Sequence, residues 1–97
     1  MKYKGEAIKN KKVIEEGYFN GGHPREVTRK LVSLMKDKNK EYDRSIIYIA
    51  NEAGEKWMFS VKRTNGTTFV RPIKSSSMLN QDELDMIFSG NQRIVET

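Results

Sequence analysis

The sequence predicts a single small α+β domain over residues 1–97, in which a small antiparallel sheet packs with a basic helix and a short acidic C-terminal helix. Three observations predict this fold class. An Asn65-Gly66 pair between two β-rich runs is the strongest short-range signal of a hairpin. A chain of 97 residues with 36% hydrophobic content can build one core. Apolar residues at helical spacing predict an amphipathic helix, at Val27, Leu31, Leu34 and Met35.

The N-terminal part of the chain predicts a two-stranded ribbon followed by that helix. Residues 1–19 mix apolar and charged side chains and predict two short strands around a turn at residues 9–12. Gly21 and Gly22 then interrupt the strand pattern, because paired glycines allow unusual backbone angles. Pro24 suits the first turn of a helix over residues 23–36, because the N–H that proline lacks would have no partner there. Residues 37–44 have almost nothing to bury and predict a solvated connection.

Residues 45–73 predict a three-stranded meander. Its first strand, residues 45–51, carries a β-branched and aromatic run that indicates a largely buried strand. The other two strands, residues 56–63 and 67–73, flank the Asn65-Gly66 turn. A type I′ turn there fixes the register and places Thr64 opposite Thr67, Val61 opposite Val70 and Phe59 opposite Pro72. Because Pro72 has no N–H to donate to a neighbouring strand, we expect the last strand at a sheet edge.

The register divides the hairpin into two faces, because side chains alternate along a strand. The face that we expect in the core carries Trp57, Phe59, Val61 and Val70. The other face carries Met58, Ser60, Lys62, Phe69, Arg71 and Ile73. This second face is either exposed to solvent or covered by a helix. If a helix covers it, the charged ends of Lys62 and Arg71 would extend to the edge of the covered surface.

The last predicted element is a helix over residues 80–89. Asn80 suits the N-cap, Glu83 the third helical position and Gly90 a left-handed C-cap. The apolar stripe of this helix consists of Leu84, Ile87 and Phe88. Residues 92–97 are predicted to form a short strand or a tail.

Charge is the strongest functional indication. The chain carries 18 Lys and Arg against 13 Asp and Glu, a net charge of +5. The surplus is uneven, since residues 1–74 carry 17 basic and 9 acidic side chains, whereas residues 75–97 carry one Arg against four acids. A basic surplus of this kind favours polyanionic partners.

Composition also narrows the location and the chemistry. The chain has no cysteine, which suits the reducing cytoplasm, and it lacks both a signal-peptide core and a membrane-length apolar run, so we expect a cytoplasmic protein without a membrane partner. One histidine, His23, cannot supply a hydrolytic triad or a zinc site. The acids at the start of the last helix are explained by its dipole. We therefore expect no enzymatic activity, no metal and no cofactor.

The leading hypothesis is a small basic regulatory or accessory protein that contacts the phosphates of DNA or RNA without catalysis. An α-helix turns by about 100° per residue, and this rotation places the basic residues of the first helix on one stripe opposite its apolar face. The second hairpin face adds cations beside an aromatic ring, a mixture typical of surfaces that bind single strands. The predicted nucleic-acid contacts are Arg25, Arg29, Lys36, Lys62, Phe69 and Arg71.

The alternative hypothesis is a protein-binding inhibitor or accessory module acting on a larger assembly. The C-terminal helix has more apolar groups than one face of a short helix needs, so Leu84, Ile87 and Phe88 could bind a partner. The same helix could dock across a homodimer or pack on its own sheet. An acidic protein would also complement the basic surface of residues 1–74.

Overall fold

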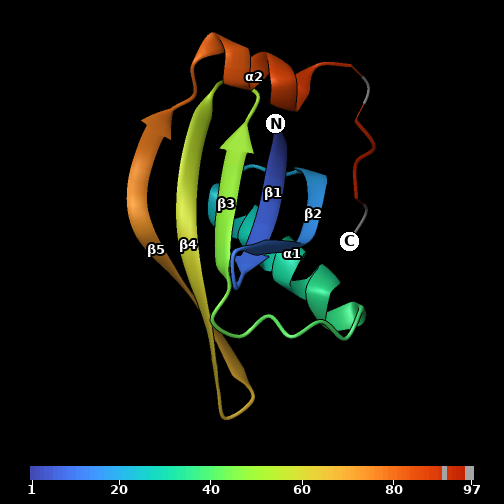
Figure 1. The fold of residues 1–97 in the computed structure, drawn as a ribbon, viewed down its shortest axis with the longest axis vertical. Helices are drawn as coiled ribbons and strands as arrows, with labels where there is room; N and C mark the ends of the chain where they lie inside the picture. Colours follow the sequence, from blue (N-terminus) through green and yellow to red (C-terminus); the bar gives the residue numbers. More distant parts are fainter. Residues whose placement is uncertain (91, 96–97) are drawn as a thin grey trace.

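The computed structural model describes residues 1–90 and 92–95, without the side chains of residues 74–77. Over these residues the chain forms one five-stranded antiparallel sheet, in the order β2-β1-β3-β4-β5, and two helices (Figure 1). Helix α1 lies against one face of the sheet, and α2 crosses one end of the other face (Figure 1). The predicted α+β fold class is confirmed.

The N-terminal ribbon is the predicted hairpin. It consists of β1 (Lys2–Lys9) and β2 (Lys12–Asn20), joined by a turn in which Asn10 and Lys11 have positive φ angles of 53° and 65°. Two consecutive positive φ angles are typical of a type I′ turn. On its other side β1 pairs with β3, with Glu6 opposite Tyr48. The ribbon and the meander are therefore parts of one sheet.

The meander consists of β3 (Ile46–Asn51), β4 (Glu55–Thr64) and β5 (Thr67–Met78). The predicted register is confirmed, with Thr64 opposite Thr67, Val61 opposite Val70 and Phe59 opposite Pro72. Strand β5 runs five residues past its predicted end, because pairing with β4 resumes after an irregularity near Met58. As expected from Pro72, β5 is an edge strand.

The core lies between α1 (Pro24–Asp37) and one face of the sheet, which we call the helix face. Phe59 and Val61 are buried there as predicted, and Trp57 and Val70 pack beside them partly buried. The fully buried side chains of α1 and the sheet include Val27, Leu31, Met35, Phe19, Ile47 and Ile49. Because α1 uses its apolar stripe on this face, it cannot cover the other one.

Helix α1 is fixed at its start by a cap. The imidazole Nδ1 of His23 accepts a hydrogen bond from the Arg25 backbone N–H at 3.2 Å, and Pro24 occupies the first helical position. His23 therefore satisfies one of the backbone donors that a helix leaves free at its N-terminus. This accounts for the single histidine as a structural residue, one position before the helix.

The connection after α1 is not simply solvated, contrary to expectation. Tyr42 is buried in the core, and its hydroxyl lies 3.1 Å from the Thr68 Oγ1 on β5. Ser45 is buried beside it and donates its hydroxyl to the Tyr42 carbonyl at 2.6 Å. A single aromatic side chain among charged neighbours gives no periodic pattern, so the sequence did not reveal this anchor.

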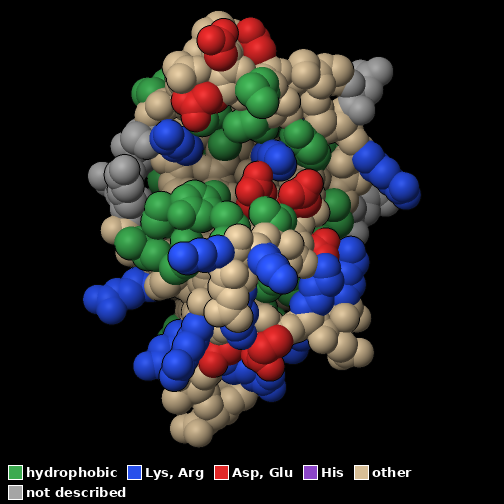
Figure 2. Space-filling model, in the orientation of Figure 1, with side chains coloured by type: hydrophobic (Ala, Val, Ile, Leu, Met, Phe, Trp, Pro, Cys, Tyr) green, Lys and Arg blue, Asp and Glu red, His purple; other side chains and the backbone are tan. Residues whose placement is uncertain are grey.

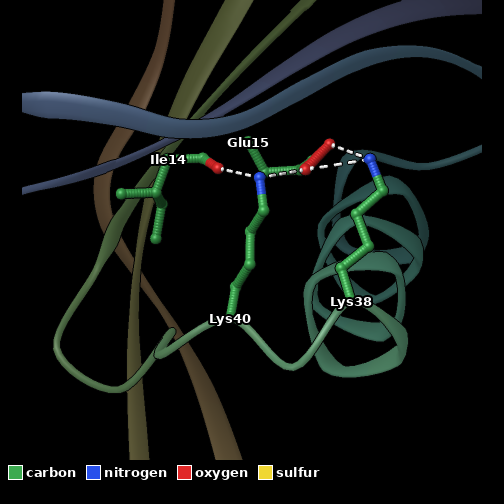
Figure 3. A network of polar contacts seen from close by, with 4 residues as sticks. All are labelled: Ile14, Glu15, Lys38 and Lys40. Atoms are coloured by element: carbon green, nitrogen blue, oxygen red, sulfur yellow. Dashed lines mark hydrogen bonds and ion pairs between the residues drawn. The ribbon is translucent and has the colours of Figure 1, made fainter.

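A polar network ties the same connection to β2 (Figure 3). The carboxylate of Glu15, buried on the helix face, accepts hydrogen bonds from Lys38 Nζ at 3.0 and 3.2 Å and from Lys40 Nζ at 2.7 Å. Lys40 also donates to the Ile14 carbonyl. Burial alone would raise the pKa of Glu15, but the hydrogen bonds and charges of the two lysines outweigh it and lower that pKa. Glu15 is therefore held as a carboxylate.

Helix α2 (Gln81–Phe88) begins as predicted after its Asn80 cap and ends one residue before its predicted end at residue 89. Asn80 and Glu83 form a reciprocal capping box, and Gly90 has a φ of +81° just beyond the last turn. After α2 the chain returns along β2, where Ile94 makes a parallel bridge with Tyr18. The rest of the predicted tail, Glu96 and Thr97, lies outside the described residues. Neither helix in the described part of the chain combines the length and apolarity needed to span a membrane.

Candidate nucleic-acid interface

The face of the sheet opposite α1 is exposed over much of its area, and we call it the open face. Its side chains come from alternate positions of β1, β3, β4 and β5, which the registers bring side by side. Figure 2 looks onto this face and shows hydrophobic side chains bordered by Lys and Arg, with acidic side chains among them near the centre. Three large apolar side chains stand out by exposure: Phe69 at 56%, Ile73 at 50% and Tyr48 at 42%.

Two cations lie at the hairpin end of the open face. Lys62 on β4 is directly opposite Phe69 on β5, and Arg71 is opposite Ser60. Lys62, Phe69 and Arg71 are all exposed, so the three predicted contacts on this hairpin share one accessible surface. No ion pair engages Lys62 or Arg71 among the residues that the structure describes. Their charges are therefore available to a ligand.

The middle of the open face is apolar on β3 and β4, with the Glu6 carboxylate opposite Tyr48 on β1, and its far end is basic again. Tyr48 is opposite Met58, and one step along the strands Ile46 is opposite Ser60. In the other direction come Lys4 and Lys56, which lie on either side of Ala50 on β3. Cations thus border the aromatic and apolar centre at both ends.

Helix α2 closes the far end of the open face and leaves a cavity of about 380 Å³ between itself and the sheet, which we call the α2 cavity. Its walls include Tyr48 and Met58 from the sheet and Leu79 and Ile87 from the α2 segment. A volume of this size falls within the range of about 300 to 1,000 Å³ typical of small-ligand sites. The open face therefore ends in a pocket.

The basic stripe of α1 lies on the other side of the sheet. Arg25 is partly buried, and its Nη1 donates to the Val70 carbonyl at 3.3 Å, which ties it to the edge of β5. Arg29 and Lys36 are exposed beside a shallow groove between α1 and β5. The six predicted contact residues therefore form two separate groups on opposite sides of the sheet. Lys62, Phe69 and Arg71 lie on the open face, and Arg25, Arg29 and Lys36 lie on α1.

The apolar stripe of α2 turns towards its own sheet. Leu84, Ile87 and Phe88 are each partly buried. The Phe88 ring meets the Tyr18 ring of β2 edge-on, with centroids 6.1 Å apart, and the Tyr18 hydroxyl donates to the Ile87 carbonyl at 2.5 Å. Packing on the sheet therefore accounts for much of the apolar stripe that the alternative hypothesis assigned to a partner.

Several open-face residues were not among the predicted contacts. Strand β3 is largely buried, as expected, with Ile47, Ile49 and Ala50 buried, but Tyr48 is exposed. Lys4 and Lys56 were also missed, because their position beside Tyr48 depends on the pairing of β1, β3 and β4. Residues 46–50 are apolar without interruption, so the sequence carried no alternation that could mark Tyr48 as exposed.

Within the described residues, no cluster of three or more His, Cys, Asp and Glu side chains is placed to hold a metal ion. Comparison of the chain with protein-family models, with curated proteins and with solved structures finds no match. The function must therefore be inferred from the geometry and charge of the open face.

Proposed function

We propose that the protein binds single-stranded nucleic acid on the open face of its sheet, as a non-enzymatic regulatory or accessory protein. The observation that carries this proposal is a sheet face left uncovered, with two exposed aromatic rings and with Lys62 and Arg71, which make no ion pair among the described residues. A flat, two-dimensional array of this composition suits a strand whose bases are unstacked and accessible.

The aromatic rings supply the contacts to bases. Phe69 and Tyr48 lie two strands and several residues apart, a separation of about 16 Å by standard strand spacings. Each ring can stack with one base, and Met58 and Ile46 between them offer an apolar surface. Stacking accepts every base because each has a π-face, so we expect little sequence specificity.

The cations supply the contacts to phosphates. Lys62 and Arg71 border Phe69, and Lys4 and Lys56 lie two residue positions along the strands from Tyr48. Lys4 is also paired with Glu6, which lies opposite Tyr48 on β1. Arg29 and Lys36 face away from this surface and attract a strand mainly through the overall positive field. The proposed contact set therefore keeps Lys62, Phe69 and Arg71 and replaces the α1 stripe with Lys4, Tyr48 and Lys56.

Anisotropy of labelled 12-nucleotide single strands and of matched duplexes tests this proposal. We expect the single strands to bind more tightly, with an affinity that falls as salt rises. Phe69→Ala and Tyr48→Ala should each weaken binding by about 1 to 3 kcal/mol, or about 5- to 150-fold. Met86→Ala, which removes an exposed apolar side chain from α2 rather than from the open face, is the matched control. Unchanged affinity in both aromatic variants would refute the proposal.

A second candidate is a protein-binding module, favoured by two exposed methionines near α2. Met78 is 62% and Met86 83% exposed, and flexible thioether side chains are common on protein-binding surfaces. A partner captured by the wild type and lost with Met78→Glu/Met86→Glu, in a protein that binds no nucleic acid, would support this candidate. Capture that survives both substitutions would count against it.

A further inference from the structure

The α2 cavity gives the proposed strand a place to end. Helix α2 crosses one end of the sheet (Figure 1), and Lys4 and Lys56 line the cavity at that end. The Leu79 backbone N–H donates to the Gly54 carbonyl at 2.6 Å, and Tyr18 holds the other end of the helix. A strand that follows the open face from Phe69 towards Tyr48 therefore meets a wall.

The cavity has two walls suited to a flat ring. Tyr48 and Met58 form the side that belongs to the sheet, and Leu79 and Ile87 form the side that belongs to the α2 segment. A base that enters between these walls would have apolar atoms against both of its faces. Elsewhere on the open face, only one face of a base can be covered. The cavity can therefore hold one nucleotide more completely than any other part of the surface.

Charged groups around the cavity define which end of a strand fits. Lys4 and Lys56 can meet a phosphate, whereas the carboxylates of Glu6 and Glu83 repel one. Glu6 is paired with Lys4 at 3.2 Å, and one Glu83 oxygen accepts the Asn80 backbone N–H. Each carboxylate keeps acceptor capacity, and a ribose with free 2′- and 3′-hydroxyls offers two donors.

We propose that the α2 cavity binds the 3′-terminal nucleotide of an RNA strand. The base lies between the apolar walls, the 5′-side phosphate of that nucleotide meets Lys4 and Lys56, and its hydroxyls donate to Glu6 and Glu83. This inference rests on the proposed function and adds a preference for a hydroxyl-bearing 3′ end. Internal nucleotides of the strand remain on the open face.

Competition binding with three RNAs of one sequence tests the inference: a linear strand with a 3′-hydroxyl, the same strand with a 3′-phosphate, and its circular form. We expect the 3′-hydroxyl strand to bind at least about tenfold more tightly than the other two, because they lack the terminal hydroxyls or add charge beside two carboxylates. Glu83→Gln should reduce this preference to below about threefold. Asp82→Asn, on α2 but outside the cavity walls, should leave it unchanged.

The outcomes separate this inference from the proposed function. Equal binding of all three RNAs, with weaker binding still caused by Phe69→Ala, would overturn the end preference and leave the open face intact. Adenosine competing as strongly as the RNA would assign the cavity to a small nucleoside and overturn the 3′-end assignment. No binding of any RNA would overturn the 3′-end assignment, and only the further absence of binding to single-stranded DNA would overturn the proposed function as well. A tenfold preference that persists in Glu83→Gln would refute the assigned role of that carboxylate.

Discussion

The network around Glu15 gives a prediction whose size can be estimated from its contacts. Glu15→Gln removes a carboxylate whose side chain is only 6% exposed and which accepts from Lys38 and Lys40. A hydrogen bond to a charged group contributes about 1.5 to 3 kcal/mol. The two lysine side chains are 51% and 37% exposed and can return to water, so we expect a net loss of about 1 to 2 kcal/mol. For a domain of this size that lowers the melting temperature by about 4 to 16 °C.

The same network predicts a pH dependence. Because the pKa of Glu15 is lower in the folded protein than in the unfolded chain, the network stabilises fully above the ordinary glutamate pKa of about 4.3. Its contribution is lost as the pH falls through the lowered pKa. The difference in unfolding free energy between wild type and Glu15→Gln should therefore be largest near neutral pH and shrink in acid.

Urea unfolding at several pH values, followed by circular dichroism, measures both effects. Glu16→Gln is the matched control, since this neighbouring carboxylate is exposed on the other side of β2 and should change stability by less than about 0.5 kcal/mol. The reasoning is refuted if the two variants lose equal stability, or if the effect of Glu15→Gln is as large at pH 3 as at pH 7.

Three further predictions concern the scaffold of the open face. Phe59→Ala removes a buried ring from the core and should destabilise the domain by about 3 to 5 kcal/mol in urea unfolding. Tyr18→Phe removes the hydrogen bond to the Ile87 carbonyl, so amides of α2 should exchange faster in hydrogen-exchange experiments while those of β3 keep their rates. Gly66→Ala places a Cβ at a φ of +78° and should cost about 1 kcal/mol by thermal unfolding, without loss of strand binding.

Local chemistry explains which parts of the fold could be predicted from the sequence. The Asn65-Gly66 turn fixes its own backbone geometry, so the register of β4 and β5 followed without knowledge of the rest of the chain. The capping box of α2 and the Pro24 start of α1 are equally local. The pairing of β1 with β3 joins residues about 40 positions apart and has no local signal. Without that pairing the five strands could not be placed in one sheet.

The same limit applied to the candidate site. Lys62, Phe69 and Arg71 could be placed on one face because a single hairpin positions them. The face of the sheet that α1 covers is set by tertiary packing, which the sequence does not show. Because α1 packs on the helix face, Arg29 and Lys36 lie away from Phe69. Tyr48, Lys4 and Lys56 join the surface only through the sheet order.

The most direct test of the proposed function compares two double variants that remove the same charge from opposite faces of the sheet. Lys62→Gln/Arg71→Gln changes the open face, and Arg29→Gln/Lys36→Gln changes the α1 stripe. Affinity for a 12-nucleotide single strand is measured at several salt concentrations. We expect the open-face variant to lower the slope of log affinity against log salt by about 1.4, at about 0.7 per phosphate contact, and the α1 variant, which changes only the overall field, to lower it by less than half as much. A reduced slope in the α1 variant alone, or equal reductions in both, would contradict an open-face binding site.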